Sequence, residues 1–157
     1  MKILRSIAAA AAAVVILSSS AQAQAIGIQG LWGEDTDLGL GARLEWGLDN
    51  VFTTQGAFSR TFLITEFNWF FPDCDECSFF EINGNLAVPI TARTIDPYAG
   101  LGINIARAAV DIGDETISDT EVGLNLLGGL RFNLGTLGAY TEGRFVVSGG
   151  EQFVLTF

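Results

Sequence analysis

The sequence between Leu38 and Leu48 alternates strictly between two kinds of residue. The even positions are all apolar, whereas the odd positions hold only glycine and charged residues: Leu38, Leu40, Ala42, Leu44, Trp46 and Leu48 against Gly39, Gly41, Arg43, Glu45 and Gly47. Successive side chains point to opposite faces in a β-strand, whereas a helix repeats every 3.6 residues and would mix the two sets. The segment therefore predicts a strand with one continuous apolar face.

Seven further segments read as strands, which gives eight in total: Ala25–Gly33, Phe58–Phe71, Phe80–Val88, Tyr98–Arg107, Glu121–Asn133, Leu137–Val147 and Gly149–Phe157. The chain is 49% hydrophobic and has 19 glycines, yet beyond its first residues no run of about 18 apolar residues predicts a transmembrane helix. A closed barrel is the other structure that satisfies every backbone group inside a membrane. We predict an all-β, eight-stranded antiparallel up-and-down transmembrane β-barrel.

The first 23 residues have the pattern of a secretory signal peptide. Lys2 and Arg5 precede an apolar run from Ile7 to Leu17, and Ala21-Gln22-Ala23 forms a small-x-small cleavage site. The alternative, a membrane anchor, needs a longer apolar run of about 20 residues. We expect a signal peptide over 1–23 and a barrel domain over 24–157, exported through the secretory pathway to the outer membrane of a Gram-negative-type bacterium.

In the predicted strands, alternate positions form a mostly apolar set and a mostly polar set, which we call the apolar parity and the polar parity. The residues of the polar parity indicate which face of the barrel lies inside. On a membrane barrel the apolar parity faces lipid, and glycines leave room in the lumen for long polar side chains. The polar parity here carries three cations and four anions, which we expect to pair in a network that closes the lumen: Arg43, Glu45, Glu66, Glu81, Arg131, Glu142 and Arg144. Two alternatives stay open. One is a narrow ion or solute channel past the arginines, and the other is a soluble secreted barrel that binds a small apolar ligand inside.

Negative charge is concentrated in the connections that we place outside the cell. Without residues 1–23, six arginines face 18 acidic residues, a formal charge of 6 − 18 = −12, so a basic footprint for nucleic acid is absent. Eleven of the 18 lie in the outer connections: Glu34, Asp35, Asp37, Asp73, Asp75, Glu76, Asp111, Asp114, Glu115, Asp119 and Glu151.

The connection 111–120 contains the acidic sequence DIGDETISD. Its carboxylates could bind Ca²⁺, but it lacks the ligand order of an EF-hand loop, and a solvated acidic loop is the simpler interpretation. Divalent cations that bridge the acidic connections to lipopolysaccharide phosphates are a further alternative.

Cys74 and Cys77 lie in the outer connection PDCDECS. Two cysteines in an exported chain most simply form a disulfide. A zinc site needs about four ligands; without any histidine or further cysteine, it would have to use Asp73, Asp75 or Glu76. Free thiols are the third possibility. We expect the disulfide, and neither a metal nor a cofactor.

Three short motifs match the pattern of a known family. Pro97-Tyr98-Ala99-Gly100-Leu101-Gly102 resembles a Pro-Tyr-x-Gly-x-Gly that opens a strand, and Gly128-Gly129-Leu130-Arg131-Phe132 resembles a glycine-rich later strand. The alternating end of the chain, Phe153, Leu155 and Phe157, resembles the signal read by the outer-membrane assembly machinery. The chain from Gln24 to Phe157 thus resembles the small eight-stranded outer-membrane barrels of the outer-membrane protein A/X and opacity-protein type.

That resemblance implies a structural, adhesive or surface-interaction role, with no shared catalytic residues. It also implies outer-membrane lipid and the assembly machinery as partners. The absence of histidine closes the Ser-His route of lipid hydrolysis, which needs a base to activate the nucleophile. We therefore expect a monomeric, non-enzymatic barrel.

Overall fold

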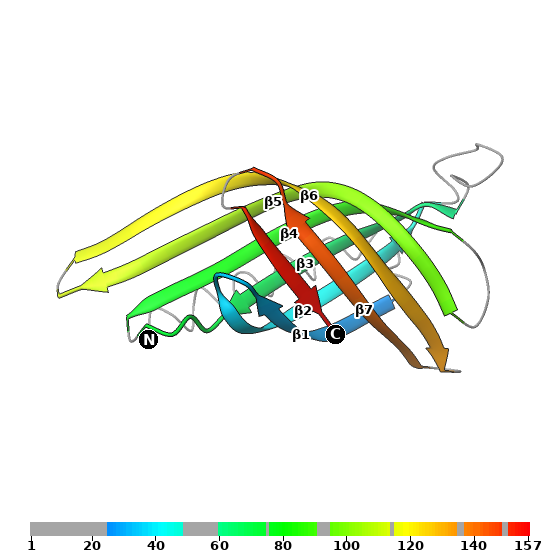
Figure 1. Ribbon diagram of the computed structural model, residues 1–157, viewed down its shortest axis with the longest axis horizontal. Helices are drawn as coiled ribbons and strands as arrows, with labels where there is room; N and C mark the ends of the chain where they lie inside the picture. The colour runs from blue at the N-terminus through cyan, green and yellow to red at the C-terminus, as the bar shows by residue number, and fades with distance from the viewer. Residues whose placement is uncertain are drawn as a thin grey trace, which may run out of the picture.

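The computed structural model of the chain is a closed antiparallel barrel in which the strands follow one another in chain order (Figure 1). It describes residues 25–48, 60–74, 76–90, 95–113, 115–134, 137–148 and 151–157. The eight strands are β1 (Ala25–Gly33), β2 (Asp37–Gly47), β3 (Phe62–Phe70), β4 (Cys77–Pro89), β5 (Ile95–Ile112), β6 (Glu115–Leu134), β7 (Leu137–Val146) and β8 (Gln152–Thr156). The predicted all-β, eight-stranded antiparallel barrel is confirmed.

Side chains alternate between two environments along the strands. On β2, Leu38 and Leu40 are each 62% exposed, whereas Arg43 on the other parity is 1% exposed. On β6, Leu124 and Leu126 are more than half exposed, and Asn125 between them is 1% exposed. The apolar parity therefore faces outward and the polar parity faces the lumen, which is the arrangement of a membrane barrel rather than a soluble one.

The two ends of the barrel differ in shape. One end carries the turns β1–β2, β3–β4, β5–β6 and β7–β8 and the disulfide, and we call it the disulfide end; the other is the opposite end. At the disulfide end β6 runs well past β7, whose last residue, Val146, pairs with Asn125, and β5 and β6 project together as a hairpin at the left of Figure 1. β5 runs only slightly past β4: Cys77 at the start of β4 pairs with Val110, and the Asp111 amide donates to the Glu76 carbonyl at 3.0 Å, so Ile112 pairs with β6 alone.

The predicted outer connection from Asp111 to Thr120 is therefore wrong. β5 continues to Ile112 and β6 begins at Glu115, and backbone pairing runs from Ile112↔Glu115 along the hairpin. Within the hairpin Thr116 donates a 2.6 Å hydrogen bond to Asp111. Both faces of this part of β6 are exposed, so no apolar side is needed and no hydrophobic alternation signals the strand.

The barrel closes between β1 and β8 along a short contact. Leu31, Trp32 and Gly33 pair with Thr156, Leu155 and Val154. The backbone of Phe157 exchanges two hydrogen bonds with Gly30, of 2.8 and 3.0 Å. The predicted last strand is thus present, although its described part is shorter than 149–157.

No helix among the described residues is long and apolar enough to cross a membrane. The predicted signal peptide, residues 1–23, lies outside the described residues, as does the predicted connection 49–57.

Candidate functional site

The lumen forms the candidate site, and Arg43 on β2 makes the largest number of polar contacts in it. Its Nε donates to Glu45 at 2.9 Å, and its Nη1 donates to Glu142 at 2.9 Å and to Glu66 at 3.3 Å. Its Nη2 donates to the Tyr98 hydroxyl at 3.2 Å. One guanidinium, which is 1% exposed, thereby links β2, β3, β5 and β7 across the interior.

A second arginine extends this network toward β4. Arg144 on β7 donates to Glu81 in an ion pair, and it lies 3.8 Å from Glu66. The other oxygen of Glu81 accepts a 2.6 Å hydrogen bond from Gln152 on β8. Because Glu66 lies between Arg43 and Arg144, the two groups form one connected network.

The third arginine lies at the opposite end of the lumen. Arg131 on β6 pairs with Glu45 at 2.9 Å and remains 27% exposed. Its guanidinium lies 4.1 Å from the centre of the Phe62 ring, a cation–π contact. The structure thus brings together all seven charged residues that the sequence places on the lumen parity.

The charges of this network do not balance. Three arginines face four glutamates, so the formal charge of the seven groups is 3 − 4 = −1. Removing one partner of a buried ion pair leaves an uncompensated charge in a low-dielectric interior, which costs far more than the pair itself contributes. Glu81 and Glu142 each contact one arginine and depend on it, whereas Glu45 and Glu66 each contact two.

Four asparagines from three strands continue the polar packing. Asn125 donates to Asn83 and Asn85 at 2.9 and 2.8 Å, and Asn104 donates to Asn83 at 2.9 Å. All four are at most 1% exposed. Their amides cross-link β4, β5 and β6 from the inside.

Two apolar clusters in the lumen were not predicted from the sequence. One lies at the disulfide end and the other toward the opposite end: Leu31, Phe70 and Val154 with Phe79, and Phe62, Ile64, Ala87, Tyr98 and Leu127. On β3 the inward parity includes Phe62, Ile64 and Phe70, while the outward parity includes Leu63, Phe67 and Trp69. With apolar residues on both parities, alternation along this strand does not reveal which ones face the lumen.

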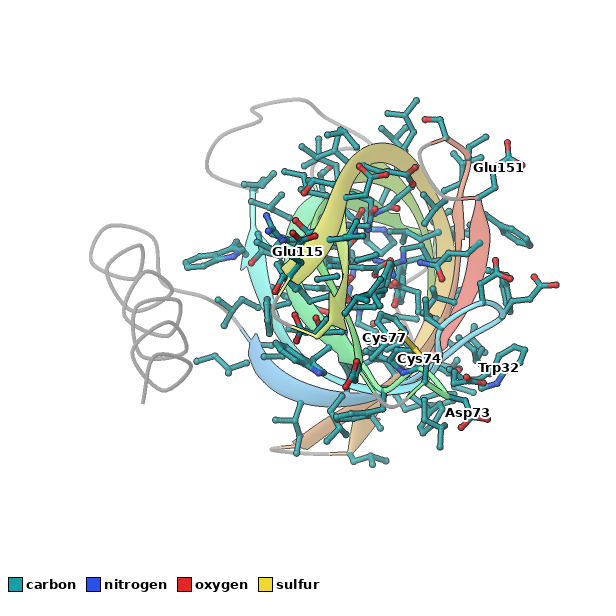
Figure 2. The ribbon with its side chains drawn as sticks, turned by 90° about the vertical axis from the view of Figure 1, so that its left-hand side faces the viewer. Trp32, Asp73, Cys74, Cys77, Glu115 and Glu151 are labelled. Carbon is teal, nitrogen blue, oxygen red and sulfur yellow. A yellow bond between two sulfur atoms is a disulfide. The ribbon has the colours of Figure 1, made fainter. Side chains whose placement is uncertain are left out.

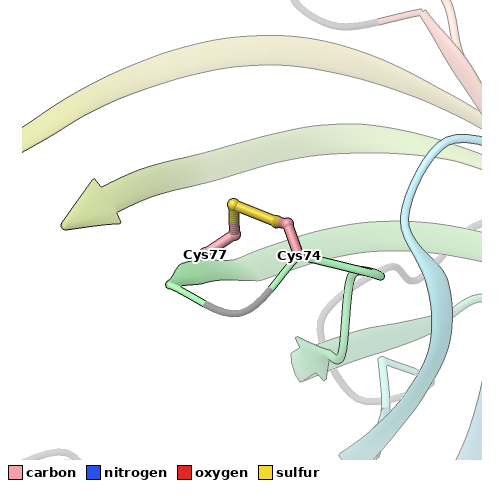
Figure 3. The surroundings of a disulfide bond; sticks show 2 residues. All are labelled: Cys74 and Cys77. Carbon is pink, nitrogen blue, oxygen red and sulfur yellow. A yellow bond between two sulfur atoms is a disulfide. The ribbon is translucent and has the colours of Figure 1, made fainter. Parts of the chain in front are cut away.

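The rim of the disulfide end carries the two cysteines and many acidic residues. Cys74 and Cys77 form a disulfide that closes the turn before β4 (Figure 3). Asp73, Glu115 and Glu151 lie around this end in Figure 2, and all three are exposed. Among the described residues, no three His, Cys, Asp or Glu side chains are grouped so that they could hold a metal ion.

Comparisons with known proteins bear on the fold. No protein-family model matches the sequence, and no curated protein matches it. The structure is similar to the N-terminal β-barrel domain of Pseudomonas aeruginosa OprF, with a TM-score of 0.57 at 12% identity over 83% of this chain and 93% of that one. It is similar to Neisserial surface protein A, with a TM-score of 0.54 at 12% identity over 83% and 92%.

Both similar structures are eight-stranded outer-membrane barrels. The chain therefore has the fold of the small outer-membrane barrels, and the resemblance found in the sequence is confirmed at the level of the fold.

Proposed function

We propose that the protein is an integral outer-membrane barrel with a structural or surface-interaction role and with a lumen closed by its charged network. The observation that carries the proposal is that polarity is distributed in the reverse of a soluble protein, with apolar side chains on the outer wall and charged side chains in the lumen. Ile26 and Ile28 are 80% and 91% exposed on the wall, while Arg43 and Glu81 are almost fully buried in the lumen. Soluble proteins rarely expose a large contiguous apolar surface, so this wall supports contact with lipid and does not fit the soluble alternative.

Exposed aromatic residues near the disulfide end support the same placement. Trp32, Trp69 and Phe71 are 42%, 36% and 55% exposed and lie at or next to the ends of their strands. Figure 2 shows Trp32 pointing away from the barrel wall. Aromatic rings of this kind gather at the level of the lipid headgroups, because they have an apolar body and a polar edge.

Fractionation of cells that express the full chain tests the membrane proposal. We expect the protein in the outer-membrane fraction, soluble only in detergent, and with a gel migration that changes on heating as a folded barrel denatures. Recovery of the folded protein from the soluble periplasm would refute the proposal.

The closed lumen is supported by side chains that meet across the interior. Arg43 reaches Glu142 on β7, 99 residues away in the sequence, and Arg144 reaches Glu81, 63 residues away. Eight strands leave an interior that side chains are able to fill. Planar-bilayer recording with the purified protein should show no stable single-channel current; a reproducible current step would instead favour the narrow-channel alternative.

The surface role is supported by the projecting β5–β6 hairpin. Its described residues from Asp111 to Glu121 are exposed on both faces and carry four carboxylates: Asp111, Glu115, Asp119 and Glu121. This shape offers a surface beyond the membrane to a partner outside the cell. The same proposal includes export by a signal peptide over 1–23 and insertion by the assembly machinery, which would read Phe153, Leu155 and Phe157. It also includes a monomeric state, with neither nucleic-acid binding nor catalysis.

A further inference from the structure

One arginine lies on the outer wall of the barrel and has no part in the lumen network. Arg107 follows Ile103 and Ile105 on the outward parity of β5, and these two isoleucines are 53% and 41% exposed. Its neighbours in the sheet are Phe80 on β4 and Thr120 on β6. The apolar wall therefore ends at a guanidinium on this side of the barrel.

Aromatic residues lie next to Arg107 in the sheet. Phe80 pairs with both Arg107 and Trp69, and the rings of Phe80 and Trp69 stack with centroids 6.2 Å apart. Phe67 adds a third ring, 6.0 Å from that of Phe80. Because aromatic belts mark the boundary between acyl chains and headgroups, Arg107 is placed at the level of the headgroups.

Arg107 differs from the other described arginines in its position on the barrel. Of the five described arginines, Arg43, Arg131 and Arg144 pair with glutamates in the lumen, and Arg60 is exposed at the opposite end. Among the described residues, Arg107 is the one cation on the outer wall at the disulfide end, and no carboxylate lies within ion-pair distance of it.

The donors of Arg107 are largely available to an outside group. Its Nη2 donates a 2.9 Å hydrogen bond to the Ser118 hydroxyl on β6, which holds the side chain over the β5–β6 face. A guanidinium has five N–H donors in a planar fork that matches phosphate oxygens. Asp111, on the same parity of β5 as Arg107, already accepts a 2.6 Å hydrogen bond from the Thr116 hydroxyl through its carboxylate.

We propose that Arg107 binds the phosphate of an anionic membrane lipid, with Ser118 and Thr120 as neighbouring hydroxyl donors and with the acyl chains against Ile105 and Phe80. This inference deepens the proposed function, because it requires the barrel wall to lie in a membrane. Charge-assisted hydrogen bonds from arginine to phosphate are among the strong ones. Elsewhere the rim of this end is acidic and disfavours a phosphate. The direct contact to the phosphate is therefore on the β4–β6 wall.

The test compares Arg107→Gln with the wild type and with Arg60→Gln, which removes an exposed cation at the opposite end. Each protein is reconstituted in phosphatidylcholine nanodiscs that contain a small fraction of phosphorylated lipid A, and in matched nanodiscs with the dephosphorylated lipid. Native mass spectrometry then measures the lipid that each barrel retains. We expect the phosphorylated lipid to bind the wild type and Arg60→Gln alike, and Arg107→Gln about tenfold more weakly.

Equal retention by Arg107→Gln, or equal retention of the dephosphorylated lipid by the wild type, would overturn the inference. Inorganic phosphate added to the protein in detergent should leave the bound lipid in place; displacement would show a site for free phosphate and would also overturn it. Heat-modifiable migration is measured on the same samples. If the proposed function fails, the wild type does not insert, whereas if this inference alone fails, all three proteins insert and retain lipid equally.

Discussion

Replacing Arg43 by glutamine tests the charged network at its most connected residue. The substitution removes a guanidinium that contacts Glu45, Glu66 and Glu142, and it changes the formal charge of the seven groups from −1 to −2. The three carboxylates are not affected equally. Glu45 keeps Arg131 at 2.9 Å, and Glu66 keeps Arg144 at 3.8 Å.

Glu142 loses its arginine entirely. Among the described residues, its remaining partner is the Tyr98 hydroxyl at 2.7 Å, and its side chain is 1% exposed. The structure therefore predicts one orphaned carboxylate rather than three. Breaking one buried ion pair from one side costs about 3–5 kcal/mol, and we expect Arg43→Gln to lower the free energy of unfolding by that amount.

Urea unfolding in phosphatidylcholine vesicles, followed by tryptophan fluorescence, measures this loss. Arg60→Gln is the matched control; because Arg60 is exposed, its loss should change the free energy by less than about 0.5 kcal/mol. The double variant Arg43→Gln/Glu142→Gln removes the orphaned charge, so it should recover about 2 kcal/mol relative to Arg43→Gln alone. A single variant within about 1 kcal/mol of the wild type, or a double variant no more stable than the single, would refute the reasoning.

Three further predictions concern the strand end, the turn and the glycines. Phe157→Ala should lower the yield of folded barrel in cells more than it lowers the stability of the refolded protein, because the backbone bonds of this residue to Gly30 survive; an unchanged yield would contradict the assembly role. Reducing the disulfide Cys74–Cys77 should cost at most about 2 kcal/mol in urea unfolding, because the enclosed loop is short, and should leave heat-modifiable migration intact. Gly102→Leu should abolish folding in vitro, since even a Cβ there would collide with the β4 backbone; a folded variant on gels would count against that packing.

Alternation predicted the fold because a membrane barrel needs it on every spanning strand. On β2 one parity is apolar and the other is polar or glycine, and on β7 Ala139 and Phe145 oppose Glu142 and Arg144; the structure places Arg43 and Arg144 inward as these patterns require. The pattern fails where a strand meets only water. From Asp111 to Thr120 no face needs to be apolar, so the strand there is specified by pairing between β5 and β6 and has no periodic signal in the sequence.

The alternation of residues along a strand does not predict which side chains pair with each other in the lumen. The odd or even position of a residue in a strand tells whether its side chain points inward. The height of that side chain along the barrel axis depends on the stagger of each strand against the next. Along one row of sheet neighbours Trp46 pairs with Leu63, and the row passes through Leu86 and Leu101 to Phe145 on β7. This row climbs around a tilted barrel, so residues that share a row differ in height, and the pairing of Arg43 with Glu142 follows from the closed structure.

The glycines of the lumen parity explain how so many long side chains fit between eight strands. A Cβ on Gly129 would lie 2.5 Å from the hydroxyl oxygen of Tyr98, and a Cβ on Gly102 would collide with the Asn85 amide. Glycine on one strand thus provides the volume that a large inward side chain on its neighbour occupies, as small and large residues alternate inside narrow barrels. Tyr98, placed in this way, donates to Glu142 and accepts from Arg43. The charged network therefore depends on residues that carry no charge, and enlarging Gly129 should disturb Arg43 as surely as replacing one of its glutamates.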